Sequence, residues 1–133
     1  MIEDFTAEDA ASAKRLVSKF KNAGFQASKL ASAIEIANRM KEKKAKIYLT
    51  FTANMVASGL RGLFAEMCKK KYVDVVITTA GALEHDFIRA NAPYELGDFS
   101  MDDSALHAKG VNRIGNILVP NGRYELFEEK IKP

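Results

Sequence analysis

Three ionisable side chains in a row, Glu84, His85 and Asp86, could do chemistry because of the residues that precede them. Residues 73–77 hold a nearly unbroken β-branched run, which is typical of a strand buried on both faces of a parallel sheet. Residues 78–81 are small, so a ligand could approach their backbone, and the glycine among them permits a sharp turn. A strand that ends this way is the usual layout of a ligand site in an open α/β sheet. An ordinary strand-to-helix turn with solvated charges explains the pattern equally well.

A second candidate site follows an earlier predicted strand, residues 46–51. Apolar residues at helical spacing predict a helix over residues 55–70, so the two strands and this helix form one βαβ unit. Asn54 is placed to cap the helix, and the free N–H groups at a helix start also favour an anion. The chain has no GxGxxG motif, so this stretch does not prove a dinucleotide site. By spacing alone, capping is the favoured role of Asn54.

The rest of the chain is predicted to form helices and connections around this unit. Thr6 with Asp9 is typical of a helix start, and Gly24 of a helix stop. Asn121 is placed to cap a last helix over residues 124–130. The remaining expected elements are helices over residues 28–43, 82–90 and 101–108 (capped by Ser100), a turn over 93–97, and a loop over 112–120 that runs into a short apolar piece.

Length and composition indicate one domain of an ordinary globular protein: 133 residues, 47% hydrophobic and 28% charged. The sequence has no signal-peptide pattern and no apolar run that could cross a bilayer. Its single cysteine, Cys68, cannot form an internal disulfide, so we expect a cytoplasmic protein. A net charge of +3 does not indicate a nucleic-acid surface, and no Cys/His/Asp spacing indicates a metal site.

Several short motifs occur in a fixed order over almost the whole chain. The most specific are Thr78-Thr79-Ala80-Gly81 and Asn112-Arg113-Ile114-Gly115-Asn116. The others are Gly24-Phe25-Gln26-Ala27, Thr52-Ala53-Asn54 with Ser58-Gly59, Val73-Asp74-Val75-Val76, Glu84 with Asp86, Ala92-Pro93, Leu96-Gly97 with Phe99-Ser100, and Leu118-Val119-Pro120-Asn121. In this order they resemble the N-terminal part of the deoxyhypusine synthase family.

The resemblance implies an α/β fold, with a Rossmann-like NAD-binding parallel sheet flanked by helices. In that family NAD takes hydride from spermidine, and the aminobutyl group passes through an enzyme lysine to a lysine of the translation initiation factor 5A precursor. Carried over by motif, the residues that line NAD would be Ala53, Asn54, Met55, Val56, Ala57, Thr79, Ala80 and Gly81. Glu84 and His85 would face the polyamine, where a carboxylate stabilises an ammonium group.

The chain departs from the family pattern in two ways. His85 stands where many members have a second glutamate, and a neutral imidazole supplies no negative charge. The family's nucleophilic lysine lies in a C-terminal half that this chain does not match, so we assign no catalytic residue here. We therefore expect residues 1–133 to be a single N-terminal segment of the NAD-binding domain, incomplete without a partner half.

Three functions follow from these observations. The first is a deoxyhypusine synthase subunit or segment that works with a second chain or segment in an oligomer. The second, motivated by His85, is a homospermidine-synthase-like aminobutyltransferase that uses a small diamine acceptor. The third is a non-catalytic regulatory subunit of a full-length paralogue. In none of them do we expect a membrane or a nucleic acid to be a direct partner.

Overall fold

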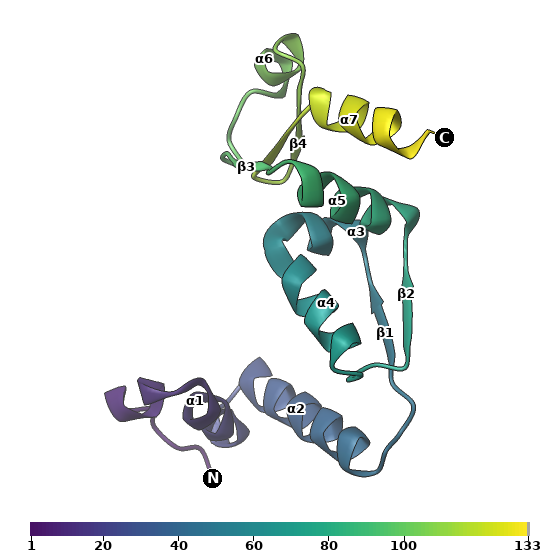
Figure 1. Ribbon diagram of the computed structural model, residues 1–133. Coiled ribbons are helices and arrows are strands. Elements are labelled where there is room, and N and C mark those ends of the chain that lie inside the picture. Colours follow the sequence, from purple (N-terminus) through teal and green to yellow (C-terminus); the bar gives the residue numbers. More distant parts are fainter. Residues whose placement is uncertain (133) are drawn as a thin grey trace. The chain divides into compact units, whose positions relative to one another are not determined.

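The computed structural model describes residues 1–132, which form two compact units, residues 1–47 and residues from 48 onward (Figure 1). The first unit is helical. It contains a 3₁₀ turn Ala7–Ala11, helix α1 (Ala13–Lys19), a second 3₁₀ turn Phe20–Asn22, and helix α2 (Gln26–Glu42).

The first unit confirms the predicted helix start but not one continuous helix. Thr6 and Asp9 form a reciprocal capping box, with the Thr6 backbone N–H donating to the Asp9 carboxylate at 2.9 Å. Ser12 then takes an extended conformation and accepts a hydrogen bond from the Arg15 backbone N–H, so a new helix begins there. The positive φ after these helices belongs to Phe25 (54°) and not to the predicted stop, Gly24.

The second unit contains the predicted βαβ arrangement. Strands β1 (Tyr48–Phe51) and β2 (Val75–Thr78) are parallel, and Phe51 lies opposite Thr78. The Phe51 ring stacks on Phe64 of the crossover helix, with ring centroids 3.9 Å apart. That contact packs the helix against one face of the strand pair, as Figure 1 shows.

The crossover helix, predicted to be continuous over residues 55–70, is broken. It consists of α3 (Ala53–Met55), a π-helical turn (Val56–Leu60) and α4 (Arg61–Lys69). Gly59 has φ +116° and ψ −4°, a conformation that breaks the α-helical path and that only glycine adopts readily.

The expectation that the strand after residue 73 is buried on both faces is wrong. Val76 is 39% exposed and Ile77 is 55% exposed, although their side chains point to opposite faces of the strand. The reason is that β2 has only one neighbouring strand, β1, in the part of the chain that the structure describes. The β-branched sequence therefore predicted the strand correctly, but it did not predict how much of the strand is exposed.

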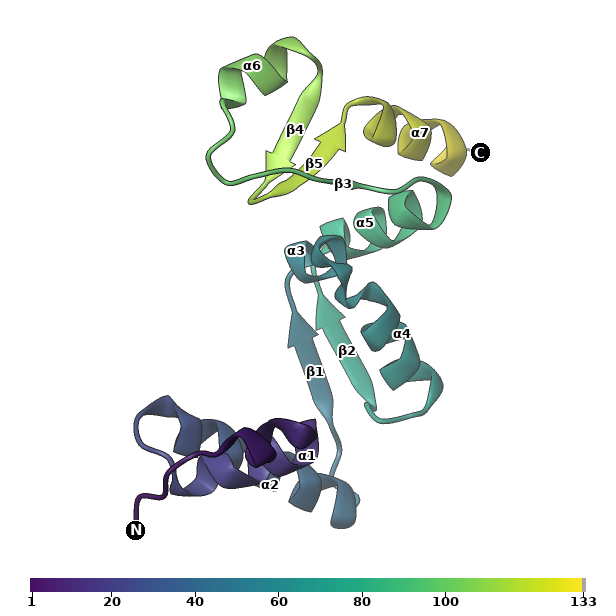
Figure 2. The same ribbon diagram turned by 90° about the vertical axis from the view of Figure 1, so that its left-hand side faces the viewer.

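An antiparallel sheet with strand order β3-β5-β4 follows along the chain (Figure 2). It replaces the predicted turn at 93–97 and loop at 112–120, because Ile114 pairs with Ile117 and Gly115 turns the chain with φ +63°. The strands are β3 (Glu95–Leu96), β4 (Val111–Ile114) and β5 (Ile117–Pro120), and the accompanying helices are α5 (Ala80–Asn91), α6 (Asp103–Ala108) and α7 (Gly122–Ile131).

Two predicted helix caps are also corrected in this region. Asp102, not Ser100, caps α6 by accepting a hydrogen bond from the Ser104 backbone N–H at 2.8 Å. Asn121 precedes α7, but its side-chain oxygen accepts from the Asn112 amide at 2.7 Å instead of capping the helix. Within residues 1–132, no helix has the length and apolar character needed to cross a membrane.

Candidate functional site

The two predicted site segments begin side by side at the carboxyl ends of the parallel strands. Thr52 and Thr79 hold the N-cap positions of α3 and α5, one residue after the paired ends of β1 and β2. A Cβ atom built at Gly81 would lie only 3.2 Å from the Cβ of Ala53. The structure therefore brings residues 53–57 and 79–81 together, at the position where open α/β sheets bind ligands.

Gly81 permits this approach in a different way from the one predicted. It lies in the first turn of α5 and has no positive φ, so it does not form a sharp turn. Its missing side chain instead allows the start of α5 to lie against Ala53. Any larger residue at position 81 would have to move one of the two helix starts.

Backbone N–H groups at the two helix starts give this edge its electrostatic character. The first turn bonds are donated by Met55 N–H to the Thr52 carbonyl at 3.1 Å and by Ala82 N–H to the Thr79 carbonyl at 2.9 Å. The residues between cap and first donor have no acceptor within their own helix. Free N–H groups at two adjacent helix starts suit an anionic group such as a phosphate.

Asn54 lies in the first turn of α3 and is not its cap, which corrects the prediction from spacing. The Thr52 hydroxyl donates to the Asn54 side-chain oxygen, so the two polar side chains that open this segment are bonded to each other. Met55 is 37% exposed, whereas the Val56 and Ala57 side chains are buried. Val56 and Ala57 could therefore meet a ligand only through their backbone.

Arg89 is a residue of this region that sequence reasoning missed. Its guanidinium donates to the Val56 carbonyl at 2.6 Å, from a position 33 residues along the chain. The bond links α5 to the π-helical turn and fixes one carbonyl of the predicted cofactor segment. Because helical spacing relates only neighbours three or four residues apart, no local pattern could have found it.

His85 is almost fully buried, and its Nδ1 atom lies 2.8 Å from the hydroxyl oxygen of Tyr94. The two rings meet edge to face, with centroids 5.7 Å apart. Burial lowers the pKa of His85 below its ordinary value, although the neighbouring Glu84 charge acts in the opposite direction. His85 is therefore neutral at pH 7 and joins α5 to the chain before β3; a direct contact with substrate stays a prediction.

Glu84 is half-buried beside two phenols. Burial raises the pKa of Tyr94 to about 12, and the charges of Tyr124 and Glu84 act in the same direction. Burial and then Glu84 also raise the pKa of Tyr124. Both phenols thus stay protonated next to the Glu84 side chain, an arrangement that could accept an ammonium group. The third predicted ionisable residue, Asp86, forms an ion pair with Arg61 instead.

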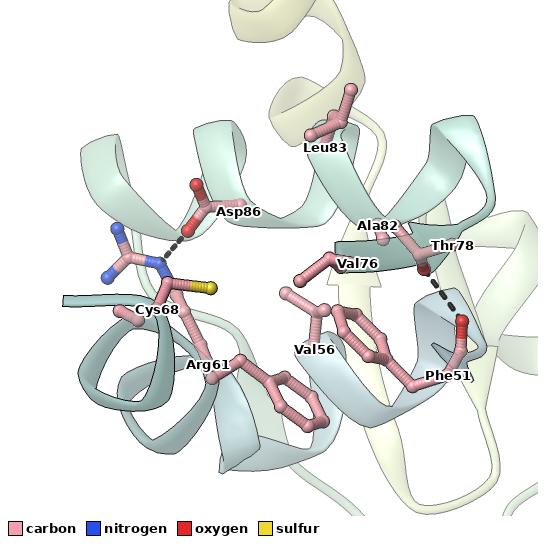
Figure 3. Close-up of a pocket in the computed structure, with 11 residues that line it drawn as sticks. Phe51, Val56, Arg61, Cys68, Val76, Thr78, Ala82, Leu83 and Asp86 are labelled. Carbon is pink, nitrogen blue, oxygen red and sulfur yellow. Dashed lines mark hydrogen bonds and ion pairs between the residues drawn. The ribbon is translucent and has the colours of Figure 1, made fainter. Parts of the chain in front are cut away.

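A groove of about 220 Å³ lies between α4, α5 and the strand pair (Figure 3). We call it the α4–α5 groove. Its lining is mostly apolar and comprises Phe51, Val56, Arg61, Phe64, Ala65, Cys68, Val76, Thr78, Ala82, Leu83 and Asp86. Among residues 1–132 no group of three or more His, Cys, Asp or Glu side chains could hold a metal ion.

Comparisons with known proteins agree on one family. Residues 15–133 match the family model described as deoxyhypusine synthase. A relative from Pyrococcus furiosus, named probable deoxyhypusine synthase, is 46% identical over 131 residues, which cover 95% of this chain and 39% of the relative. A relative of the same name from Halobacterium salinarum is 46% identical over 114 residues, 86% of this chain and 34% of its own length.

A solved structure gives the same result. A crystal structure of a protein assigned as a deoxyhypusine synthase from Entamoeba histolytica superposes with a TM-score of 0.54 at 32% identity. The match covers 68% of this chain and 38% of that one. The chain thus spans well under half the length of these relatives.

Proposed function

The chain belongs to the deoxyhypusine synthase family, and we propose that it forms the cofactor-binding part of an NAD-dependent aminobutyl transferase. The reaction would move the aminobutyl group of spermidine to a lysine of the translation initiation factor 5A precursor. The single observation that best supports this proposal is the contact between Ala53 and Gly81, because it sets two helix starts side by side at the carboxyl ends of the parallel strands.

NAD, when bound, would supply the hydride acceptor for the polyamine. The residues expected to hold it fit an adenine dinucleotide, since the close approach of Gly81 to Ala53 sets two helix starts with free N–H groups side by side. Backbone N–H groups of Ala53, Asn54, Ala80 and Gly81 would take the pyrophosphate. Arg89 would keep the first segment in place through the Val56 carbonyl.

Glu84 would hold the amine end of the substrate. A carboxylate binds an ammonium group through charge-assisted hydrogen bonds, and the protonated hydroxyls of Tyr94 and Tyr124 add acceptors nearby. His85 contributes a neutral ring that is bonded to Tyr94, so this end of the site has one fixed negative charge from residues 84 and 85.

The remaining catalytic parts would come from a second chain or segment. The chain covers 34% to 39% of the curated relatives, and it contains no lysine that matches the family's nucleophile motif. We propose that a polypeptide corresponding to the rest of the family domain supplies that lysine, in a cytoplasmic oligomer.

The test combines binding and turnover. The chain, a polypeptide carrying the rest of the domain, NAD, labelled spermidine and the factor 5A precursor are mixed, and label on the precursor is counted. In parallel, NAD binding to the assembly is titrated for Gly81→Val and for the control Gly62→Ala, since a side chain at 62 meets only open space. We expect label transfer, and an NAD affinity lowered at least about tenfold by Gly81→Val alone. No transfer, or equal affinities, would contradict the proposal.

The neutral His85 also supports a second candidate, a homospermidine-synthase-like transferase. One negative charge fewer at the amine end would weaken the binding of a long polycation relative to a small diamine. In the same assay with a free diamine present, label would then appear in a polyamine instead of on protein. A regulatory subunit, in contrast, would retain full activity of the assembly after Glu84→Ala or Asn54→Ala.

A further inference from the structure

The α4–α5 groove is an apolar surface that faces outward. Leu83 on α5 is 70% exposed and Val76 on β2 is 39% exposed, and both line it. The aromatic floor is formed by Phe51 and Phe64, whose rings stack with their centroids 3.9 Å apart. Exposure of such an apolar hollow to water is unfavourable, and burial against another apolar surface would stabilise the protein.

The strand pair beneath the groove also lacks the cover that parallel sheets normally have. Parallel strands occur almost only in sheets with both faces buried, and two strands rarely form a stable sheet alone. Here Ile77 on the face opposite Val76 is 55% exposed. The apolar groove and the exposed opposite face both indicate that further polypeptide packs against this strand pair.

The charges at the groove favour an apolar occupant over an ionic one. Arg61 and Asp86 are the only charged residues in its lining, and they pair with each other across the space between α4 and α5 (Figure 3). The pair leaves no net charge in the lining. A phosphate or an amine would therefore find no unmatched partner there, whereas aliphatic or aromatic side chains would find a matching surface.

We propose that the α4–α5 groove is the docking surface for the polypeptide that corresponds to the rest of the family domain. This inference rests on the partner half of the proposed function and names the surface that receives it. The length comparison identifies the occupant, because more than half of each relative lies outside the region that this chain matches. Apolar side chains of that polypeptide enter the groove and cover Val76, Leu83 and the stacked rings.

Cys68 supplies a native probe of this docking, since it is exposed, lines the groove and is the only cysteine in the chain. The chain is co-expressed with the part of the Pyrococcus furiosus relative that lies beyond the matched region, with its cysteines replaced by serine. The rate of thiol reaction with a disulfide reagent is then measured for the chain alone and for the purified complex, without NAD or spermidine. We expect the complex to form and the rate to fall at least about tenfold on docking.

Two variants locate the contact. Leu83→Asp places a charge in the groove, and we expect it to weaken the complex at least about tenfold. Leu63→Asp is the control, because Leu63 lies on α4, is 51% exposed and is not part of the groove lining. Far-ultraviolet circular dichroism of both variants confirms that each still folds. Equal weakening by the two variants would overturn the assignment of the surface.

Other outcomes also decide the matter. Absence of a complex, or a Cys68 that stays fully reactive within it, would overturn the docking surface. Protection that increases with the concentration of the chain alone would assign the groove to a second copy and would equally overturn the proposal. Docking with protection but without label transfer would leave this inference standing and remove the proposed activity instead.

Discussion

The two sheets of the second unit differ in how well the side chains at their centres are buried and bonded. In the antiparallel sheet Val119 is fully buried, and Arg113 donates to both carboxylate oxygens of Asp103 at 2.7 and 2.9 Å and to the Gly115 carbonyl at 2.6 Å. In the parallel pair Val76 and Ile77 remain exposed. Residues near in sequence bury the centre of the first sheet, although Leu96 of β3 stays exposed, whereas the crossover of the second sheet leaves both Val76 and Ile77 exposed.

The difference follows from strand connections. Antiparallel neighbours need only a tight turn, such as the one at Gly115, while parallel neighbours need a long crossover that covers one face. A single crossover therefore leaves apolar side chains of β2 exposed. The open sheet is also the one that carries the candidate site, so completeness of the fold and of the site are linked.

Truncation of one strand side chain in each sheet, buried Val119 and exposed Ile77, should give the largest difference between the two sheets. We expect Val119→Ala to lower the free energy of unfolding by about 2–3 kcal/mol, because two buried methyl groups are lost and a cavity remains. Ile77→Ala, at a 55% exposed position, should change it by no more than about 0.5 kcal/mol. Urea unfolding of the isolated chain gives both values, and similar losses would show that the parallel pair is covered after all.

A smaller effect should come from the crossover that belongs to the parallel pair. Gly59→Ala places a Cβ at φ +116° and should cost about 1–2 kcal/mol, although no atom lies within 4 Å of that Cβ. The matched variant Gly62→Ala has ordinary helical geometry and equally open surroundings, so it should stabilise the protein by about 0.5–1 kcal/mol. If both variants stabilised it, the π-helical turn would not exist in solution.

His85 joins α5 to the chain before β3 through Tyr94, and its titration should give a further effect that is limited to one pH range. Burial holds its folded-state pKa below the ordinary 6.5, while Glu84 and Arg89 partly oppose each other. Its contribution to stability is therefore complete above pH 6.5 and is lost as the pH falls through that value toward the lowered pKa. Urea midpoints between about pH 8 and pH 5 should decrease, and His85→Gln should flatten this decrease. An unchanged slope in the variant would assign the pH effect to other groups.

The smallest expected change concerns the Arg113–Asp103 pair, since Asp103 is 70% exposed. The hydrogen bonds from Arg113 lower the pKa of Asp103, so the pair stabilises the fold above the ordinary carboxyl value of 3.8 and ceases to do so as the pH falls below it. Arg113→Met should lower the thermal midpoint at pH 7 more than Lys132→Met, which breaks an exposed pair at the C-terminal end of α7. The difference should shrink in acid; a constant difference would mean that packing of Arg113 carries the effect.

Sequence reasoning succeeded where local patterns decide structure. The β-branched run after residue 73 and the apolar spacing over residues 55–70 placed the βαβ unit, and the family motifs placed both segments that meet at Ala53 and Gly81. It failed at the hairpin, because the polar residues of the Asn112 motif resemble a loop. Gly115 followed by Asn116 is nevertheless a short turn signal that could have revealed the hairpin.

Other failures had no local signal. The exposure of Val76 and Ile77 depends on how many strands a sheet has, which no stretch of β2 encodes. The His85–Tyr94 bond and the Arg89–Val56 bond join residues 9 and 33 positions apart across different elements. These tertiary contacts also determine how the candidate site is supported, so its residues were easier to predict than its geometry.

Val56 and Ala82 lie between the α4–α5 groove and the segments expected to bind the dinucleotide. Both are nearly fully buried and both line the α4–α5 groove, yet Val56 belongs to the segment expected to hold the dinucleotide and Ala82 follows Gly81 directly. A shift of Val56 or Ala82 on one surface would therefore also change the packing of the other surface. Heterotropic cooperativity is the thermodynamic consequence: whatever docks in the groove should alter nucleotide affinity, and the nucleotide should alter docking by the same factor.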